Sequence, residues 1–124
     1  MSISSPQISF DDRLLAVEEL FNQRKKDVAI KELAKLNRTD FESKKYELGL
    51  YLLLSAEAEF SQDNYQAATQ IGLKSASLLA DYPLNKRYGR VLIILSKSNF
   101  LIFNEMFMNL LKCPLLKKYI SQEV

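Results

Sequence analysis

The sequence predicts an all-α protein, and three observations support this fold class. Only 3 glycines and 3 prolines occur among the 124 residues, whereas a β-rich chain of this length needs many tight turns, which use these residues. Apolar residues recur at intervals of three and four along most of the chain, and no long segment alternates with period two. Apolar residues make up 48% and charged residues 26% of the chain, which is typical of a folded globular domain.

The predicted elements form one domain that follows a short tail. Residues 1–10 are expected to be a flexible N-terminal tail, and residues 11–124 a single helical domain. Three helix pairs and a short C-terminal capping helix are predicted, at about residues 11–37, 41–81, 85–112 and 115–122. Asp11 or Asp12 is expected to cap the first helix, because an aspartate there accepts hydrogen bonds from free backbone N–H groups. Pro83 is expected to end the second pair, because proline cannot continue a helix.

The first, third and fifth predicted helices repeat at a nearly constant interval. An offset of 39 superposes Phe21 on Phe60 and Ala29 on Ala68, and an offset of 40 superposes Gly49 on Gly89, Phe60 on Phe100 and Asn64 on Asn104. Each unit is therefore predicted to be a helix pair of 39–40 residues. In the third unit this predicts two helices, at residues 85–103 and 104–112, with a break before Asn104.

The middle unit resembles a tetratricopeptide repeat. The residues that carry the resemblance are a small residue, an aromatic residue, a turn and then Tyr, Ala, Ala and Pro: Ala56, Phe60, Asp63, Asn64, Tyr65, Ala68, Ala76 and Pro83. The resemblance implies a right-handed stack of antiparallel helix pairs, in which the first helices line a concave groove for a peptide or a partner's helix. The third unit departs from the pattern, because Met106, Phe107 and Met108 stand where a small residue is expected.

By position, the resemblance implies a set of groove residues on the first helix of each pair. These residues are Leu14, Glu18, Asn22, Leu53, Glu57, Arg90, Ile93, Lys97 and Leu101. Leu14, Glu18, Leu53 and Glu57 occupy the positions where the family's clamp for a terminal carboxylate needs Lys and Asn, so that clamp is not carried over. A groove that is acidic at one end and basic at the other suits a ligand of mixed charge; alternatively, each charge is simply solvated.

The segment from Val91 to Leu111 is the most apolar part of the chain and has three interpretations. A membrane span is opposed by polar residues within it, Lys97, Asn99, Asn104 and Glu105, because burying such groups in lipid is costly. A helix pair of the core is the plainest interpretation. The third is a surface for a homodimer or another protein, formed by Phe103, Met106, Phe107 and Leu110, since Met and Phe are common at adaptable interfaces.

Composition excludes most catalytic chemistry. The chain has no histidine and one cysteine, Cys113, which removes histidine-based acid–base catalysis, His-ligated zinc and an internal disulfide. We therefore expect no enzymatic activity, no cofactor and no metal site. Nucleic-acid binding through Lys86, Arg87, Arg90 and Lys97 is disfavoured, because the net charge is only +2.

The sequence thus predicts a non-catalytic adaptor or scaffold that binds a peptide or helix of another protein in its groove. The alternative is a homodimeric chaperone-like or regulatory protein, whose apolar third pair binds a secretion or assembly partner. The N-terminus has no basic, apolar signal pattern, so the cytoplasm is the expected location. Glu57 and Lys97 are expected at exposed positions, so that Glu57→Lys and Lys97→Glu would weaken partner binding but leave stability nearly unchanged.

Overall fold

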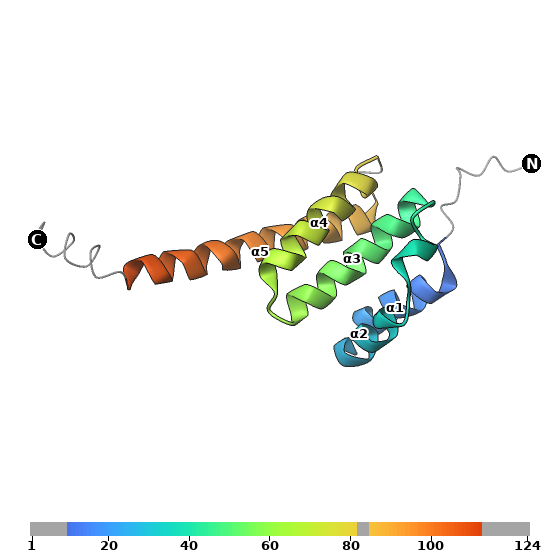
Figure 1. Cartoon of the computed structure of the whole chain (residues 1–124), viewed down its shortest axis with the longest axis horizontal. Helices are drawn as coiled ribbons and strands as arrows, with labels where there is room; N and C mark the ends of the chain where they lie inside the picture. The colour runs from blue at the N-terminus through green and yellow to red at the C-terminus, as the bar shows by residue number, and fades with distance from the viewer. Residues whose placement is uncertain (1–9, 82–84, 113–124) are drawn as a thin grey trace, which may run out of the picture.

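Five α-helices and a short 3-10 helix make up the part of the chain that the computed structural model describes, residues 10–81 and 85–112 (Figure 1). The elements are α1 (Asp12–Asn22), α2 (Lys26–Ala34), η1 (Arg38–Asp40), α3 (Lys45–Ser61), α4 (Tyr65–Leu79) and α5 (Lys86–Leu111). No strand occurs in these two stretches, and the all-α prediction is confirmed. The predicted cap at residues 115–122, nearly all of the predicted tail, Pro83 and Cys113 lie outside the described residues.

The turns of the first two helix pairs have the same backbone geometry. Arg24 and Asp63, which lie 39 positions apart, both adopt a positive φ, of 62° and 65°. In each turn the N–H group of the following residue donates to the carbonyl five positions earlier, at 2.9 Å. This is the hydrogen bond of a helix that ends on a left-handed residue. The two pairs α1–α2 and α3–α4 therefore follow the 39-residue interval that the sequence predicts.

The predicted third helix pair is wrong, because α5 is a single helix of 26 residues. An offset of 40 places Phe103 where Asp63 forms the turn of the second pair. A bulky aromatic residue strongly disfavours a positive φ, and no glycine or proline lies between Arg90 and Leu111 to end the helix. The chain therefore continues as a helix through Asn104, and the C-terminal half of α5 extends beyond the other helices (Figure 1).

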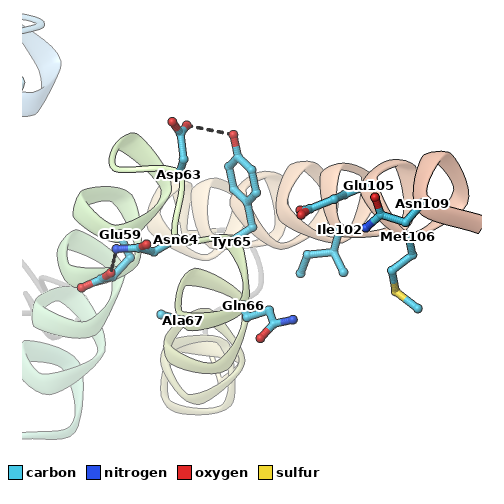
Figure 2. Close-up of a pocket in the computed structure, with 10 residues that line it drawn as sticks. All are labelled: Glu59, Asp63, Asn64, Tyr65, Gln66, Ala67, Ile102, Glu105, Met106 and Asn109. Atoms are coloured by element: carbon cyan, nitrogen blue, oxygen red, sulfur yellow. Dashed lines mark hydrogen bonds between the residues drawn. The ribbon is translucent and has the colours of Figure 1, made fainter. Parts of the chain in front are cut away.

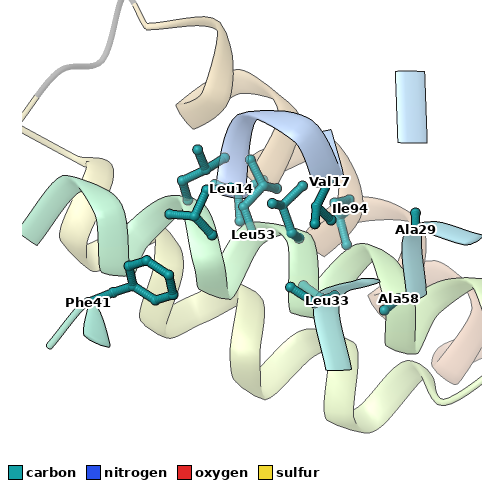
Figure 3. Close-up of a cluster of buried hydrophobic side chains, with 12 residues drawn as sticks. Leu14, Val17, Ala29, Leu33, Phe41, Leu53, Ala58 and Ile94 are labelled. Atoms are coloured by element: carbon teal, nitrogen blue, oxygen red, sulfur yellow. The ribbon is translucent and has the colours of Figure 1, made fainter. Parts of the chain in front are cut away.

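Helix α3 lies at the centre of the fold and contacts α1, α2, α4 and α5. In Figure 3, Leu14 of α1 lies beside Leu53 of α3, and both are fully buried. The rest of this core cluster comprises Val17, Ala29, Leu33, Phe41, Leu50, Leu54, Ala56, Ala58, Val91 and Ile94. Only the N-terminal half of α5 contributes to it, so the core positions the base of that helix and leaves its other half uncovered.

The two glycines that the repeat aligns have different surroundings. A Cβ atom on Gly49 would lie 2.8 Å from Cδ2 of Leu79, so this glycine permits the close approach of α3 and α4. The Ser75 hydroxyl donates to the Gly49 carbonyl at 2.7 Å across the same contact. A Cβ atom on Gly89 would meet nothing within 4 Å. The alignment at offset 40 therefore matches residue types but not packing.

Candidate interaction surface

Four charged side chains from three helices form a cluster at the base of α5. Arg87 donates two hydrogen bonds to the Glu18 carboxylate, from Nε at 2.9 Å and from Nη2 at 2.8 Å. Arg90 bridges two carboxylates, with Nη1 3.0 Å from Glu18 Oε2 and Nη2 2.5 Å from Glu57 Oε1. These contacts join α1, α3 and α5. Two parallel hydrogen bonds between an arginine and a carboxylate fix the relative orientation of the two groups in addition to pairing their charges.

Most of this cluster is withdrawn from water. The Glu18 side chain is 11% exposed and that of Glu57 17% exposed. Burial raises the pKa of Glu57 above its ordinary value, because desolvation of the carboxylate, together with the nearby charge of Glu18, outweighs the favourable charge and hydrogen bond of Arg90. The Arg87 guanidinium also lies over the Phe10 ring, 4.3 Å from its centroid. The cluster is therefore an internal contact between helices.

The residues predicted to line a concave groove fall into different environments. Leu14 and Leu53 are fully buried, so the expectation that they line an open groove is wrong: each fills space between α1 and α3. The expectation that Glu57 is exposed is also wrong, because its carboxylate is paired with Arg90. Of the remaining predicted groove residues, Glu18 is buried and paired, Arg90 and Leu101 are half-buried, and Asn22, Ile93 and Lys97 are exposed.

Part of the predicted set does converge on one small pocket. The pocket has a volume of about 320 Å³ and is lined by Glu18, Asn22, Lys86, Arg87 and Arg90. Its carboxylate and both guanidinium groups already satisfy one another. Two of the four basic residues considered for nucleic-acid binding, Arg87 and Arg90, are therefore held by carboxylates of the chain itself.

The outer side of α5 carries an uncovered apolar row. We define the outer stripe as Ile93, Ser96, Phe100, Phe103, Phe107 and Leu110. The spacing alternates between three and four residues, so these positions share one side of the helix. The five apolar members are 47–67% exposed, as is Met106 beside them. All four residues predicted for an oligomer or partner surface, Phe103, Met106, Phe107 and Leu110, are exposed.

The inner side of the same helix behaves differently. In its N-terminal half, Val91, Ile94, Leu95 and Ser98 are buried against the fold. Further along, the same side becomes polar at Glu105 and Asn109, which line a groove of about 640 Å³ beside the α3–α4 turn. Figure 2 shows this groove, where the Tyr65 hydroxyl donates to Asp63 at 2.9 Å. Ile102 and Met106 also line this groove, so the inner side is mixed in character, whereas the outer side carries a continuous apolar row.

Comparison with known proteins identifies no relative. No protein-family model, curated protein or solved structure matches the chain. Within residues 10–81 and 85–112, no group of three or more His, Cys, Asp or Glu side chains is placed to hold a metal ion. Of the described helices, α5 has the length and composition of a membrane span, with a mean hydropathy of 1.4, and 22% of its apolar window is buried in the fold.

Sequence reasoning missed both the ion-pair cluster and the full length of the outer stripe. The cluster joins residues 69 and 72 positions apart, and nothing local to Glu18 indicates its partners. The stripe does have a local signal, the alternating spacing of three and four from Ile93 to Leu110. The predicted break before Asn104 separates this spacing into two short segments, and the repeat assigns Phe100 to its aromatic position.

Proposed function

We propose that this chain is a non-catalytic protein–protein interaction domain that binds an apolar α-helix along the outer stripe of α5. The observation that carries the proposal is the exposure of Ile93, Phe100, Phe103, Phe107 and Leu110 in one row on a helix whose opposite side is buried in its N-terminal half. A contiguous exposed apolar row on a folded domain marks an interaction site. An adaptor or scaffold role in the cytoplasm is consistent with such a surface.

A tetratricopeptide-like arrangement of the helices is part of the same proposal. It is supported by the pattern of contacts, because α3 packs on both helices of the first pair and α5 packs on both helices of the second. It is also supported by the equivalent turns at Arg24 and Asp63. In this arrangement α5 occupies the place of the first helix of a third pair. Its outer stripe then lies where the second helix of that pair or a partner's helix would pack.

Helix α5 favours a protein partner over a membrane. Its N-terminal half is held to the fold by Val91, Ile94 and Leu95 and by the ion pairs of Arg87 and Arg90. A bilayer enclosing α5 would have to displace the helices packed against that side and leave Glu18 and Glu57 without partners. Losing a buried ion-pair partner is strongly destabilising.

The proposal is tested by affinity capture from the source cell with three forms of the immobilised chain: wild type, Phe103→Glu and Leu73→Glu. Leu73 lies on α4 away from the stripe and is 57% exposed, close to the 67% of Phe103, so it is a matched control. We expect proteins, or a second copy of the chain, that bind the wild type and Leu73→Glu but not Phe103→Glu. A set of bound proteins that is identical for all three forms would contradict a role for the stripe.

A further inference from the structure

We infer that the outer stripe binds the outer stripe of a second copy of this chain, with the two α5 helices antiparallel. This inference rests on the proposed function, because it names the partner of the same surface. From Ile93 to Leu110 the stripe follows the a and d positions of a heptad repeat, which is the spacing that keeps two long helices in contact. It spans 18 of the 26 residues of α5.

The exposed apolar area is close to what a dimer needs. A fully exposed side chain of the size of Phe or Met presents about 200 Å². The five apolar members of the stripe and Met106 are 47–67% exposed, so together they present on the order of 700 Å². The largest apolar patch of a typical monomer is about 300–600 Å², whereas a standard interface buries about 800 Å² on each partner. The stripe therefore has about the area that a stable dimer needs.

Side-chain volumes favour the antiparallel orientation. In a two-fold symmetric antiparallel pair with full overlap, Ile93 meets the partner's Leu110, Ser96 meets the partner's Phe107, and Phe100 meets the partner's Phe103. The large Phe107 then faces the small Ser96, so the layer volumes are more even than in a parallel pair. In a parallel pair each residue meets its own copy, so two serines would leave a gap and three successive layers would each hold two phenylalanines. Uneven layers of this kind pack poorly.

Access and charge also permit this pairing. The helices that cover α5 lie against its inner side, at Val91, Ile94 and Leu95, so they do not obstruct a second helix on the outer side. Lys97, Glu105 and Lys112 are the charged residues between Val91 and Lys112, and none belongs to the stripe. Only Lys97 lies beside it, and in the antiparallel pair it is close to the partner's Asn104 rather than to another lysine.

The first test is the mass of the full chain in solution, measured by light scattering. The protein concentration should be on the order of 10–100 µM, which is comparable to the dissociation constants of ordinary dimers. We expect twice the chain mass of 14.3 kDa for the wild type and for Leu73→Glu, and the monomer mass for Phe103→Glu. A charge in a central layer should weaken dimerisation by about 100-fold or more. Circular dichroism checks that the variant remains a folded helical domain, which is expected because Phe103 is exposed and contributes nothing to the core.

The second test distinguishes the two orientations by mixing Phe103→Glu with Phe100→Lys, each expected to be monomeric alone. In the antiparallel pair, a mixed dimer has one Glu–Lys layer and one Phe–Phe layer, so mixing should restore the dimer mass. In a parallel pair both charges stay opposite phenylalanine, and mixing restores nothing. Monomers in the mixture, with a dimeric wild type, would overturn the antiparallel pairing.

Three further outcomes are informative, and the first separates this inference from the proposed function. A wild type that stays monomeric at 100 µM, but still captures cellular proteins in a Phe103-dependent way, overturns only the second copy as the partner. A monomer that captures no protein but floats with anionic phosphatidylserine–phosphatidylcholine vesicles, unless Phe103 is replaced by Glu, overturns both. A dimer that persists in Phe103→Glu places the interface elsewhere and also overturns the inference.

Discussion

The ion-pair cluster at the base of α5 makes the stability of the fold sensitive to Glu18. Replacing Glu18 by Gln keeps the shape of the side chain but removes the charge that two arginines share, Arg87 at 2.8 Å and Arg90 at 3.0 Å. Removing one partner of a fully buried ion pair costs about 3–5 kcal/mol. Because the two arginine side chains are about a quarter exposed, water solvates part of the freed charge. We therefore expect the free energy of unfolding to fall by about 2–3 kcal/mol.

Urea unfolding followed by circular dichroism at one fixed protein concentration measures this loss. With a slope of about 1–3 kcal/mol per molar urea, the midpoint of the Glu18→Gln variant should fall by about 1 M or more. Glu32→Gln is the matched control, since Glu32 pairs with Lys35 at the same 2.8 Å but on an exposed helix face; its effect should stay below about 0.5 kcal/mol. Equal midpoints for Glu18→Gln and Glu32→Gln would refute the assignment of the cluster as a stabilising contact.

Other residues give predictions that the same urea assay can check. Gly89→Ala should stabilise the chain by up to about 1 kcal/mol, because the added Cβ meets nothing; Gly49→Ala should destabilise it, because overpacking costs about 1–3 kcal/mol. Equal effects would contradict the different packing of the two glycines. Arg24→Gly should stabilise the chain by about 1 kcal/mol, because Arg24 has a φ of 62°, which glycine adopts without strain. A lower urea midpoint for this variant would contradict backbone strain at Arg24. Glu57→Lys should cost about 2 kcal/mol or more, because it faces Arg90; an unchanged midpoint would support the original expectation of an exposed site.

The first four helices and the turns of the first two helix pairs could be predicted because their signals are local. Asp11 caps α1 as expected, with its side chain accepting from the backbone N–H of Arg13. The turns at Arg24 and Asp63 follow polar sequences at the same phase of a 39-residue interval. Periodicity, capping and turn residues act over a few positions, so one sequence is sufficient to read them.

The prediction of a break in α5 was wrong, and the physical reason is also local. Asparagine tolerates a turn but does not require one. The residue before Asn104 is Phe103, which does not adopt the left-handed conformation that Asp63 adopts at the end of α3. The repeat suggested a break, but the residues around Asn104 favour a continuing helix. The local helix preference of these residues outweighs the repeat pattern, so α5 is one long helix where a third helix pair was predicted.

The groove residues could not be placed from sequence because helix periodicity defines a face but not what covers it. Leu14 and Glu18 are one turn apart on α1, as the spacing predicts, yet the side that they share points toward α3 and α5. Burial there depends on the angle at which α1 crosses α3, which is set by contacts between distant residues. Glu18 therefore became part of an internal ion-pair cluster and not of an open groove.

The ion-pair cluster and the outer stripe are connected through α5. An isolated helix shorter than about 12–15 residues is marginally stable in water, and residues 103–111 of α5 are exposed on every side. This part of the helix is supported by its continuity with the N-terminal half, which Arg87 and Arg90 fix to α1 and α3. The cluster therefore orients the stripe before any partner arrives. A partner that covers the stripe supplies the apolar contacts that the C-terminal half lacks, so association and helix stability reinforce each other.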